Sequence, residues 1–376
     1  MRYKLGDICE IVSGSTPKTS VPDYWDGDVK WITPAELSDD SYIIYDSARK
    51  ITTLGVEKTG LRSFPAGTVI LSSRAPIGKV AIAGCEMYCN QGFKNLICSG
   101  KINNRYLYWF LKGHTELLNS LGRGATFKEI SKQIVSAIEI DVPDIRKQEE
   151  TVQTLEKISG LIQLRKNELL GLDHLIKARF VEMFAGEKNL MAMSDICSII
   201  TDGTHQPPKF KEDGIPFIFV SNITNDKLTY EAEKFIDQDT YNELVKRTPI
   251  EIGDVLLSTV GSYGHPAVVK SDKKFLFQRH IAYLKPKREI VDSDYLHGAI
   301  LSPGAQRQIE QGVKGIAQKT LNLSEIKKMR IPIPNMDKQK EFATFVAQVD
   351  KSKAEVQKSL DEAQILFDSL MQQYFG

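Results

Sequence analysis

Two stretches of this chain, 144–184 and 335–375, repeat one heptad pattern, and this duplication constrains the fold more than any other feature. In the first stretch one stripe consists of Leu155, Ile162, Leu169, Ile176 and Met183, and a second of Ile158 and Leu172. In the second stretch the matching stripes consist of Val346, Lys353, Leu360, Phe367 and Tyr374, and of Val349, Val356, Ala363 and Leu370. Heptads sustained over this length predict long helices that pack against a partner helix. Because the pattern occurs twice, we expect each helix to find its partner in the same chain.

The ends and the interruptions of the two stretches are also informative. Asp144 and Asn335 each follow a proline and are expected to act as N-caps. A rise of about 1.5 Å per residue makes each helix roughly 60 Å long, which favours a spacer over an ordinary helical hairpin inside a globular core. Arg165 and Lys353 place polar groups at core-type positions, where such residues usually fix register or partner choice.

The long helices divide the chain into four segments. We predict a globular domain at 1–143, a spacer helix at 144–186, a second globular domain at 187–334 and a second spacer helix at 335–376.

The two globular segments share short motifs in the same order. Leu5-Gly-Asp-Ile is answered by Met193-Ser-Asp-Ile, and Gly67-Thr-Val-Ile-Leu-Ser-Ser by Gly253-Asp-Val-Leu-Leu-Ser-Thr. Short runs of Val, Ile and aromatic residues between turn residues predict strands, with short helices near 103–121 and 292–311. The repetition therefore predicts two similar α+β domains.

Composition excludes several classes of protein. The 376 residues include 49 Lys and Arg against 48 Asp and Glu, a net charge of +1, which argues against a protein that coats nucleic acid by bulk charge. The chain has no long apolar run and no apolar signal core, so neither membrane insertion nor secretion is indicated, and we expect a cytoplasmic protein. The five cysteines form no C-x-x-C pair, and neither a disulfide framework nor a metal site is predicted.

No motif for catalysis is present. The segment from Ser73 to Val80 lacks the leading glycine and the final Ser or Thr of a phosphate-binding loop. We therefore expect a non-catalytic chain. Two alternatives stay open: a methyltransferase or nuclease with an unrecognised active site, and a pure scaffold whose helices organise other proteins.

The order of these features resembles the specificity subunit of type I restriction–modification enzymes. Both domains begin with a Leu-Gly-Asp-Ile-type segment and end in an Ile-x-x-Pro step, at Pro143 and Pro334, followed by Gln148 or Gln339 and a long helix. The resemblance covers essentially the whole chain. It implies an α+β fold in which two similar target recognition domains are separated by an antiparallel coiled coil of two long helices, with pseudo-two-fold symmetry.

The resemblance also implies function and partners. Each domain would read one half of a bipartite target in double-stranded DNA, and the helices would dock two modification subunits. S-adenosylmethionine is expected only in those subunits, so this chain would hold no cofactor. Whether two restriction subunits, which are motor-nucleases, also assemble with it stays open.

Candidate DNA-binding residues are mainly basic, amide and hydroxyl side chains on glycine-rich loops, because such groups read base edges or hold phosphates. In the first domain they are Thr16, Lys18, Ser73, Arg74, Lys79, Gln91, Lys94, Arg123, Thr126 and Lys128. In the second domain they are Thr204, His205, Thr259, Ser262, Tyr263, Gln278, Arg279, His280, Lys314, Gln318 and Lys319.

Overall fold

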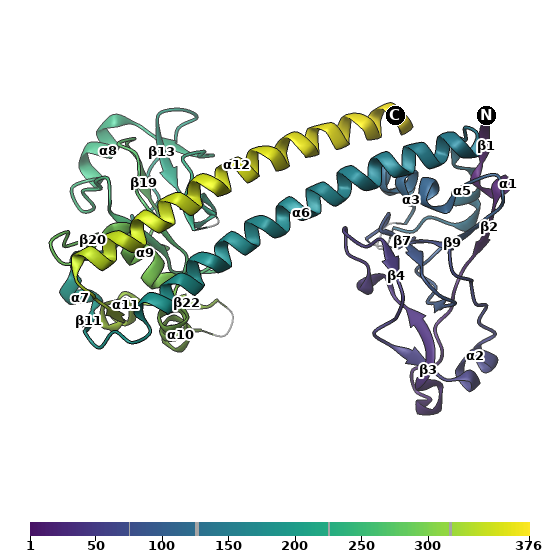
Figure 1. Ribbon diagram of the computed structural model, residues 1–376, viewed down its shortest axis with the longest axis horizontal. Coiled ribbons are helices and arrows are strands. Elements are labelled where there is room, and N and C mark those ends of the chain that lie inside the picture. Colours follow the sequence, from purple (N-terminus) through teal and green to yellow (C-terminus); the bar gives the residue numbers. More distant parts are fainter. Residues whose placement is uncertain (75, 125–127, 225, 316–317) are drawn as a thin grey trace. The chain divides into compact units, whose positions relative to one another are not determined.

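The computed structural model describes residues 1–74, 76–124, 128–224, 226–315 and 318–376. The chain forms two compact units, Met1–Leu164 with Leu360–Gly376, and Arg165–Ser359. Each unit holds one globular domain and a part of each long helix, α6 (Ile145–Phe184) and α12 (Met336–Phe375) (Figure 1). The predicted α+β class is confirmed.

Both long helices begin where the sequence places their caps. The Asp144 carboxylate accepts a hydrogen bond from the N–H of Lys147 at 2.9 Å. The Asn335 side-chain oxygen accepts one from the N–H of Lys338 at 3.0 Å. Both N-cap predictions are confirmed. No helix in the described part of the chain is long and apolar enough to cross a membrane.

Contacts within the second unit show that the two helices are antiparallel. Arg179 of α6 pairs with Glu341 of α12 at 3.4 Å, and Asp173 of α6 pairs with Lys353 of α12. The partner residue moves backward along α12 as the position moves forward along α6. The polar residue Lys353 thus has a specific partner at its core-type position, whereas Arg165 pairs with a residue of its own helix.

The first domain contains ten strands and five short α-helices among its described residues. The strands are β1 (Arg2–Lys4), β2 (Cys9–Val12), β3 (Trp25–Ile32), β4 (Ile43–Ile44), β5 (Lys50–Ile51), β6 (Val69–Leu71), β7 (Val80–Ala83), β8 (Tyr88–Cys89), β9 (Asn95–Cys98) and β10 (Glu139–Asp141). The helices are α1 (Leu5–Ile8), α2 (Thr53–Thr59), α3 (Asn104–Gly113), α4 (Thr115–Leu121) and α5 (Lys132–Ala137), with 3-10 turns η1 (Pro22–Tyr24) and η2 (Pro34–Glu36).

The second domain contains thirteen strands and five short α-helices among its described residues. Its strands are β11 (Leu190–Ala192), β12 (Cys197–Asp202), β13 (Ile215–Ile218), β14 (Ile223–Thr224), β15 (Lys227–Leu228), β16 (Phe235–Ile236), β17 (Val255–Ser258), β18 (Pro266–Val268), β19 (Leu276–Phe277), β20 (Ile281–Pro286), β21 (Val313–Lys314), β22 (Thr320–Leu321) and β23 (Arg330–Pro332). Its helices are α7 (Met193–Ile196), α8 (Gln238–Leu244), α9 (Ser293–Leu301), α10 (Pro303–Gly312) and α11 (Leu323–Lys328), with the 3-10 turn η3 (Val220–Asn222).

The main sheets of the two domains share a strand order, although β4 at the edge of the first sheet has no counterpart in the second. The order β2-β9-β6-β7 in the first domain matches β12-β20-β17-β18 in the second, and β5-β3-β8 matches β16-β13-β19. Each smaller sheet contains one parallel pair, β3 with β8 and β13 with β19. The predicted duplication is therefore a duplication of topology, and the predicted short helices are α3 with α4 and α9 with α10.

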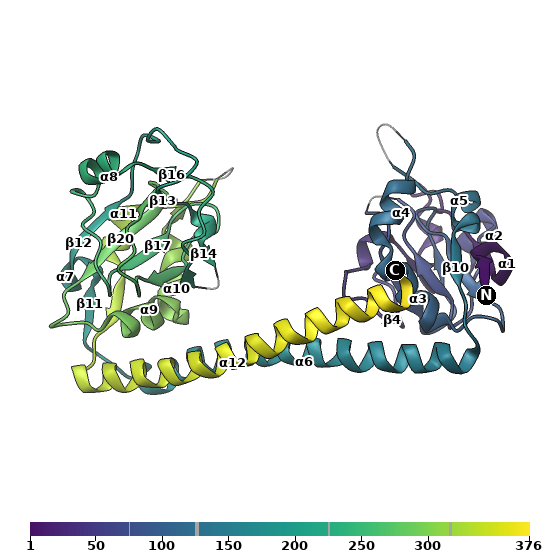
Figure 2. The same cartoon turned by 90° about the horizontal axis from the view of Figure 1, so that it is seen from above.

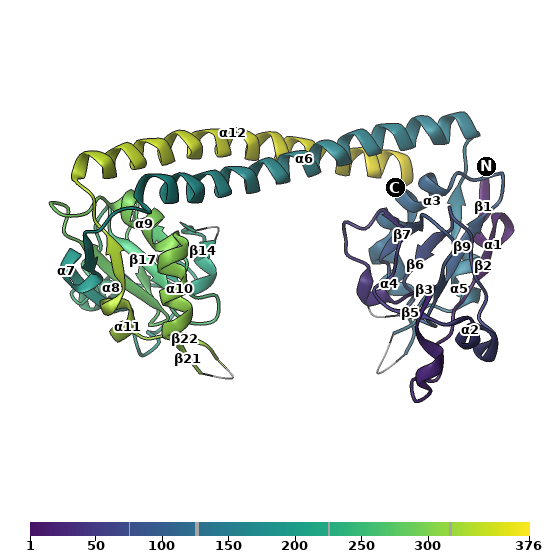
Figure 3. The same ribbon diagram turned by 60° about the horizontal axis from the view of Figure 1, so that its bottom comes forward.

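One helix of each domain packs against the long helices. In the first unit the ring of Trp109 on α3 lies 5.6 Å from that of Phe367 on α12. In the second unit Tyr295 on α9 lies 5.6 Å from Phe180 on α6 and 6.2 Å from Phe342 on α12. Figure 2 shows α9 directly against α12. Figure 3 shows the β21–β22 hairpin at the opposite end of the second domain, away from the long helices.

Candidate nucleic-acid interface

A tight turn after the central strand forms the base of the predicted interface in the first domain. The N–H of Ser72 donates to the carbonyl of Lys79 at 2.9 Å, and the N–H of Gly78 donates to the carbonyl of Ser72 at 3.1 Å. The Ser72 hydroxyl accepts from the N–H of Lys79 at 2.9 Å. Gly78 has φ +92°, a conformation that side chains disfavour. These bonds join Ser72 to Gly78 and Lys79 and so fix the two ends of the turn.

The second domain closes the same turn with the same chemistry. The N–H of Ser258 donates to the carbonyl of His265 at 3.0 Å, and the N–H of Gly264, at φ +84°, donates to the carbonyl of Ser258 at 2.9 Å. The Ser258 hydroxyl accepts from the N–H of His265 at 3.0 Å. The recurrence of this serine is therefore structural.

The residue after this serine joins three loops in each domain. The N–H of Ser73 donates to the carbonyl of Gly92 at 2.7 Å, and the carbonyl of Ser73 accepts from the N–H of Ile130 at 2.9 Å. Thr259 makes the same two bonds with the equivalent loops, at 2.9 and 2.8 Å. Loops far apart in the sequence therefore meet at one backbone position.

A fourth loop joins this platform from the start of each domain. In the first domain the Thr16 hydroxyl donates to the side-chain oxygen of Gln91 at 2.5 Å. In the second, the carbonyl of Thr204 accepts from the N–H of Arg279 at 3.1 Å. We call these four joined loops the loop platform of each domain. In the first domain it consists of segments 14–18, 72–74, 76–79, 89–94, 122–124 and 128–130, and in the second of segments 203–206, 258–265, 277–281, 313–315 and 318–321.

The predicted DNA-binding residues differ in exposure. Exposed are Lys18, Arg74, Gln91, Arg123, Lys128, His205, Ser262, Arg279, Lys314, Gln318 and Lys319. Half-buried are Thr16, Lys79, Thr204, Tyr263, Gln278 and His280. Buried are Ser73, Lys94 and Thr259, and Thr126 lies outside the described residues. The exposed residues present side chains on the platforms, whereas the buried three lie within them.

A charged trio lies on the platform of the first domain. Glu129 accepts from Nε of Arg74 at 2.9 Å through one carboxylate oxygen and from Nζ of Lys94 at 3.2 Å through the other. Lys94 also donates to the hydroxyl of Ser73 at 3.2 Å. Partial burial alone would raise the pKa of Glu129, but the hydrogen bonds and charges of Arg74 and Lys94 lower it overall. Glu129 is therefore a carboxylate at neutral pH.

The platform of the second domain carries a different set of charges. Asp202 pairs with His205 at 2.8 Å and with Arg247, which comes from beyond α8. The Nε of Arg279 lies 3.4 Å from Nε2 of His280. Burial, and then the charge of Arg279, lower the pKa of His280, so the neutral imidazole offers one donor and one acceptor.

Sequence reasoning did not identify Glu129, Asp202 or Arg247. Glu129 follows Arg74 by 55 positions, and Arg247 follows Asp202 by 45, so no local pattern connects either pair. Only the tertiary fold brings them together. Within the described ranges, no group of three His, Cys, Asp or Glu side chains is arranged to hold a metal ion.

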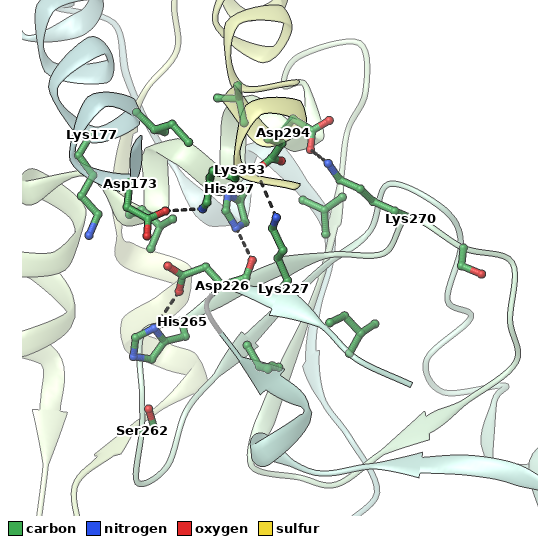
Figure 4. Close-up of a pocket in the computed structure, with 18 of the residues that line it drawn as sticks. Asp173, Lys177, Asp226, Lys227, Ser262, His265, Lys270, Asp294, His297 and Lys353 are labelled. Carbon is green, nitrogen blue, oxygen red and sulfur yellow. Dashed lines mark hydrogen bonds and ion pairs between the residues drawn. The ribbon is translucent and has the colours of Figure 1, made fainter. Parts of the chain in front are cut away.

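The second unit also contains a cavity of about 820 Å³ between its domain and its parts of the long helices (Figure 4). Lys227 reaches across it to Asp350 of α12 at 3.3 Å. On its domain side, Asp226 accepts from His265 through its carboxylate and from His297 through its carbonyl, each at 2.8 Å. The cavity therefore meets the loop platform at His265.

Side chains at equivalent positions of α3 and α9 differ in size between the two units. Tyr108 and Trp109 of α3 pack ring to ring at 5.0 Å in the first unit. The equivalent residues of α9 are His297 and Gly298. A Cβ added at Gly298 would meet the ring of Phe342 at 2.5 Å. Gly298 therefore leaves room for the ring of Phe342 in the second unit, whereas Trp109 packs against Phe367 in the first.

Comparisons with known proteins agree with this architecture. The family model of the type I restriction modification DNA specificity domain matches residues 1–173 and again residues 187–364, so nearly the whole chain is two copies of that domain. The chain belongs to the type I restriction specificity family.

Individual members of the specificity family are similar over most of their length. The type I restriction enzyme MjaIX specificity subunit of Methanocaldococcus jannaschii is 30% identical, over 91% of this chain and 85% of that protein. The fold matches the type I restriction-modification S subunit from M. genitalium, with 14% identity, a TM-score of 0.54 and coverage of 100% of this chain and 96% of that one. A chain from a structural study of type I R-M complex assembly and conformational transition matches with 16% identity, a TM-score of 0.61 and coverage of 100% and 97%. As a member of the specificity family, this chain is a specificity subunit of a type I restriction-modification system.

Proposed function

We propose that each domain reads one half of a bipartite sequence in double-stranded DNA, with domain 1 at 1–143 and domain 2 at 187–334. The loop platform carries this proposal. Equivalent backbone bonds join three loops in both domains, and a fourth loop joins them in each. The exposed side chains nevertheless differ: Arg74 and Arg123 in one domain, His205 and Arg279 in the other. A shared scaffold with different exposed donors is what reading two different half-sites requires.

The exposed residues of the platforms are proposed to contact DNA directly. Arginine and glutamine are suited to base edges, and the exposed lysines, such as Lys128 and Lys319, to phosphates. The buried members Ser73, Lys94 and Thr259 hold the loops in place through the bonds described above. Half-buried members such as Thr204 and Gln278 complete the platform surface.

The long helices are proposed to dock two modification subunits. Large apolar side chains are exposed on them, among them Leu164 at 66%, Leu175 at 46% and Leu366 at 51%. Apolar residues on a helix surface are suited to packing by a partner helix. The modification subunits would supply S-adenosylmethionine and the methyl transfer, and restriction subunits, where the system has them, would supply cleavage.

The chain itself is proposed to be non-catalytic and to act in the cytoplasm. Its net charge of +1 provides little attraction for DNA on its own, so much of the phosphate contact would come from the modification subunits. The chain assembled with modification subunits should protect and methylate one bipartite sequence, whereas the isolated chain should bind weakly and transfer no methyl groups. Methyl transfer by the isolated chain, or protection without sequence preference by the complex, would refute the proposal.

A further inference from the structure

Arg74, on the loop platform of the first domain, is held through only one of its three guanidinium nitrogens. Glu129 binds Nε of Arg74 at 2.9 Å, and within the described residues the two terminal nitrogens of Arg74 have no hydrogen-bond partner. The Arg74 side chain is 44% exposed. Two adjacent N–H donors on a fixed plane match the O6 and N7 acceptors of guanine in the major groove.

The backbone fixes the positions of these side chains. Glu129 lies directly opposite Arg74 on one side and opposite Arg123 on the other, both in antiparallel bridges. Residues directly opposite in an antiparallel pair project to the same face, with Cβ atoms about 5 Å apart. Both arginines therefore emerge on the face of Glu129, and Glu129 is the only acidic member of the trio with Arg74 and Lys94.

The second domain shows that the shared fold does not require this trio. In the second domain the equivalent bridge joins Val260, in place of Arg74, to Thr320, in place of Glu129. Ala282 of β20 occupies the position equivalent to Lys94. The equivalent backbone bonds of the second platform, at 2.9 and 2.8 Å, form around these uncharged residues. Burying the ammonium of Lys94 carries a desolvation cost that only its ion pair with Glu129 offsets. Because the fold forms without these charges in the second domain, we infer that they serve recognition in the first.

We propose that Glu129 is a positioning residue for DNA reading, which holds Arg74 by Nε so that its terminal nitrogens read a guanine in the half-site of the first domain. This inference rests on the proposed function. Glu129 itself touches no base in this arrangement.

The second domain holds its own arginine in a related way from another loop. Arg279 directs Nε toward His280 at 3.4 Å, and in the described part of the structure its terminal nitrogens have no partner. Arg279 occupies the loop position equivalent to Gln91 of the first domain. The two half-sites would thus be read by arginines that lie on different loops of one scaffold.

The test uses the full chain assembled with its modification subunits and a panel of targets changed one base pair at a time. Arg74→Lys keeps the charge and removes the paired donors, so we expect about a tenfold loss of discrimination, or about 1.4 kcal/mol, at one G·C pair of one half-site. Glu129→Gln should lose discrimination at the same pair, and the double variant should lose no more than Arg74→Lys alone. The salt dependence of binding should stay unchanged.

A second variant separates positioning from folding. Glu129→Gln leaves the buried ammonium of Lys94 without its anion, which destabilises the domain. Adding Lys94→Met removes that orphaned charge, so we expect thermal stability to recover while discrimination stays lost. If discrimination recovers together with stability, Glu129 is only structural and the inference is wrong.

Controls and remaining outcomes complete the test. Arg62 and Glu10 form a matched exposed pair at 2.6 Å away from the loop platform, and Arg62→Lys and Glu10→Gln should leave discrimination unchanged. An even loss of affinity for all sequences in Arg74→Lys or Glu129→Gln, or no loss in either, would overturn the inference alone. Absence of any sequence preference in the complex without substitutions would instead overturn the proposed function.

Discussion

Replacing Gln148 by methionine should loosen the first unit selectively. Gln148 is fully buried near the start of α6, accepts from the N–H of Asn103 at 2.8 Å, and donates to the carbonyls of Lys101 at 3.1 Å and Pro143 at 2.8 Å. Methionine keeps the volume and removes all three bonds. At about 1 kcal/mol for each bond, the free energy of unfolding should fall by about 3 kcal/mol.

The chain offers a matched control and a selective probe for this prediction. Gln339 makes the equivalent three bonds in the second unit, at 2.9, 3.0 and 2.9 Å. The three tryptophans, Trp25, Trp31 and Trp109, all lie in the first unit. Tryptophan fluorescence should therefore report a transition lowered by about 6–12 °C in Gln148→Met. The reasoning fails if that transition does not move, or if Gln339→Met moves it equally.

Three further predictions concern assembly, pH and recognition. Leu164→Asp should weaken binding of modification subunits at least tenfold in sedimentation assays without changing the melting temperature. Leu54→Asp on α2, where the leucine is 41% exposed, should change neither. Burial lowers the pKa of His297 in the folded state, so the unfolded chain binds a proton more readily. The free energy of unfolding of the second unit should therefore be greatest above about pH 6.5, the usual pKa of histidine, and should fall as the pH drops below it. Circular dichroism melts should show this fall flattened in His297→Gln, and an unchanged slope would contradict it. Arg279→Ala should alter only the half-site of the second domain, and binding to half-site variants that changes in the other half would disprove this.

The long helices could be predicted closely because their signals are local. Heptad spacing requires only the identity of residues a few positions apart, and the caps at Asp144 and Asn335 act within one turn. The structure buries Leu155, Val346 and Val349 as this spacing predicts.

The loop platforms could be predicted only in part because their bonds connect distant positions. Glycine and hydroxyl residues identified the loops, but nothing in the sequence showed that Lys94 would be buried against Glu129. The parallel pairs β3–β8 and β13–β19 could not be predicted either, since one strand of each pair, β8 or β19, has only two residues and carries almost no periodic signal. Which predicted residues are exposed therefore emerges only from the fold.

The most direct test of the account exchanges residues 187–334 for the second domain of a related specificity subunit with a different target. The full-length hybrid would be assembled with modification subunits, and its methylated sites would be mapped across a genome. We expect one half of the bipartite target to change to that of the donor while the half read by residues 1–143 stays the same. A hybrid that assembles and methylates DNA but changes both halves, or neither, would contradict the claim that each domain reads one half-site.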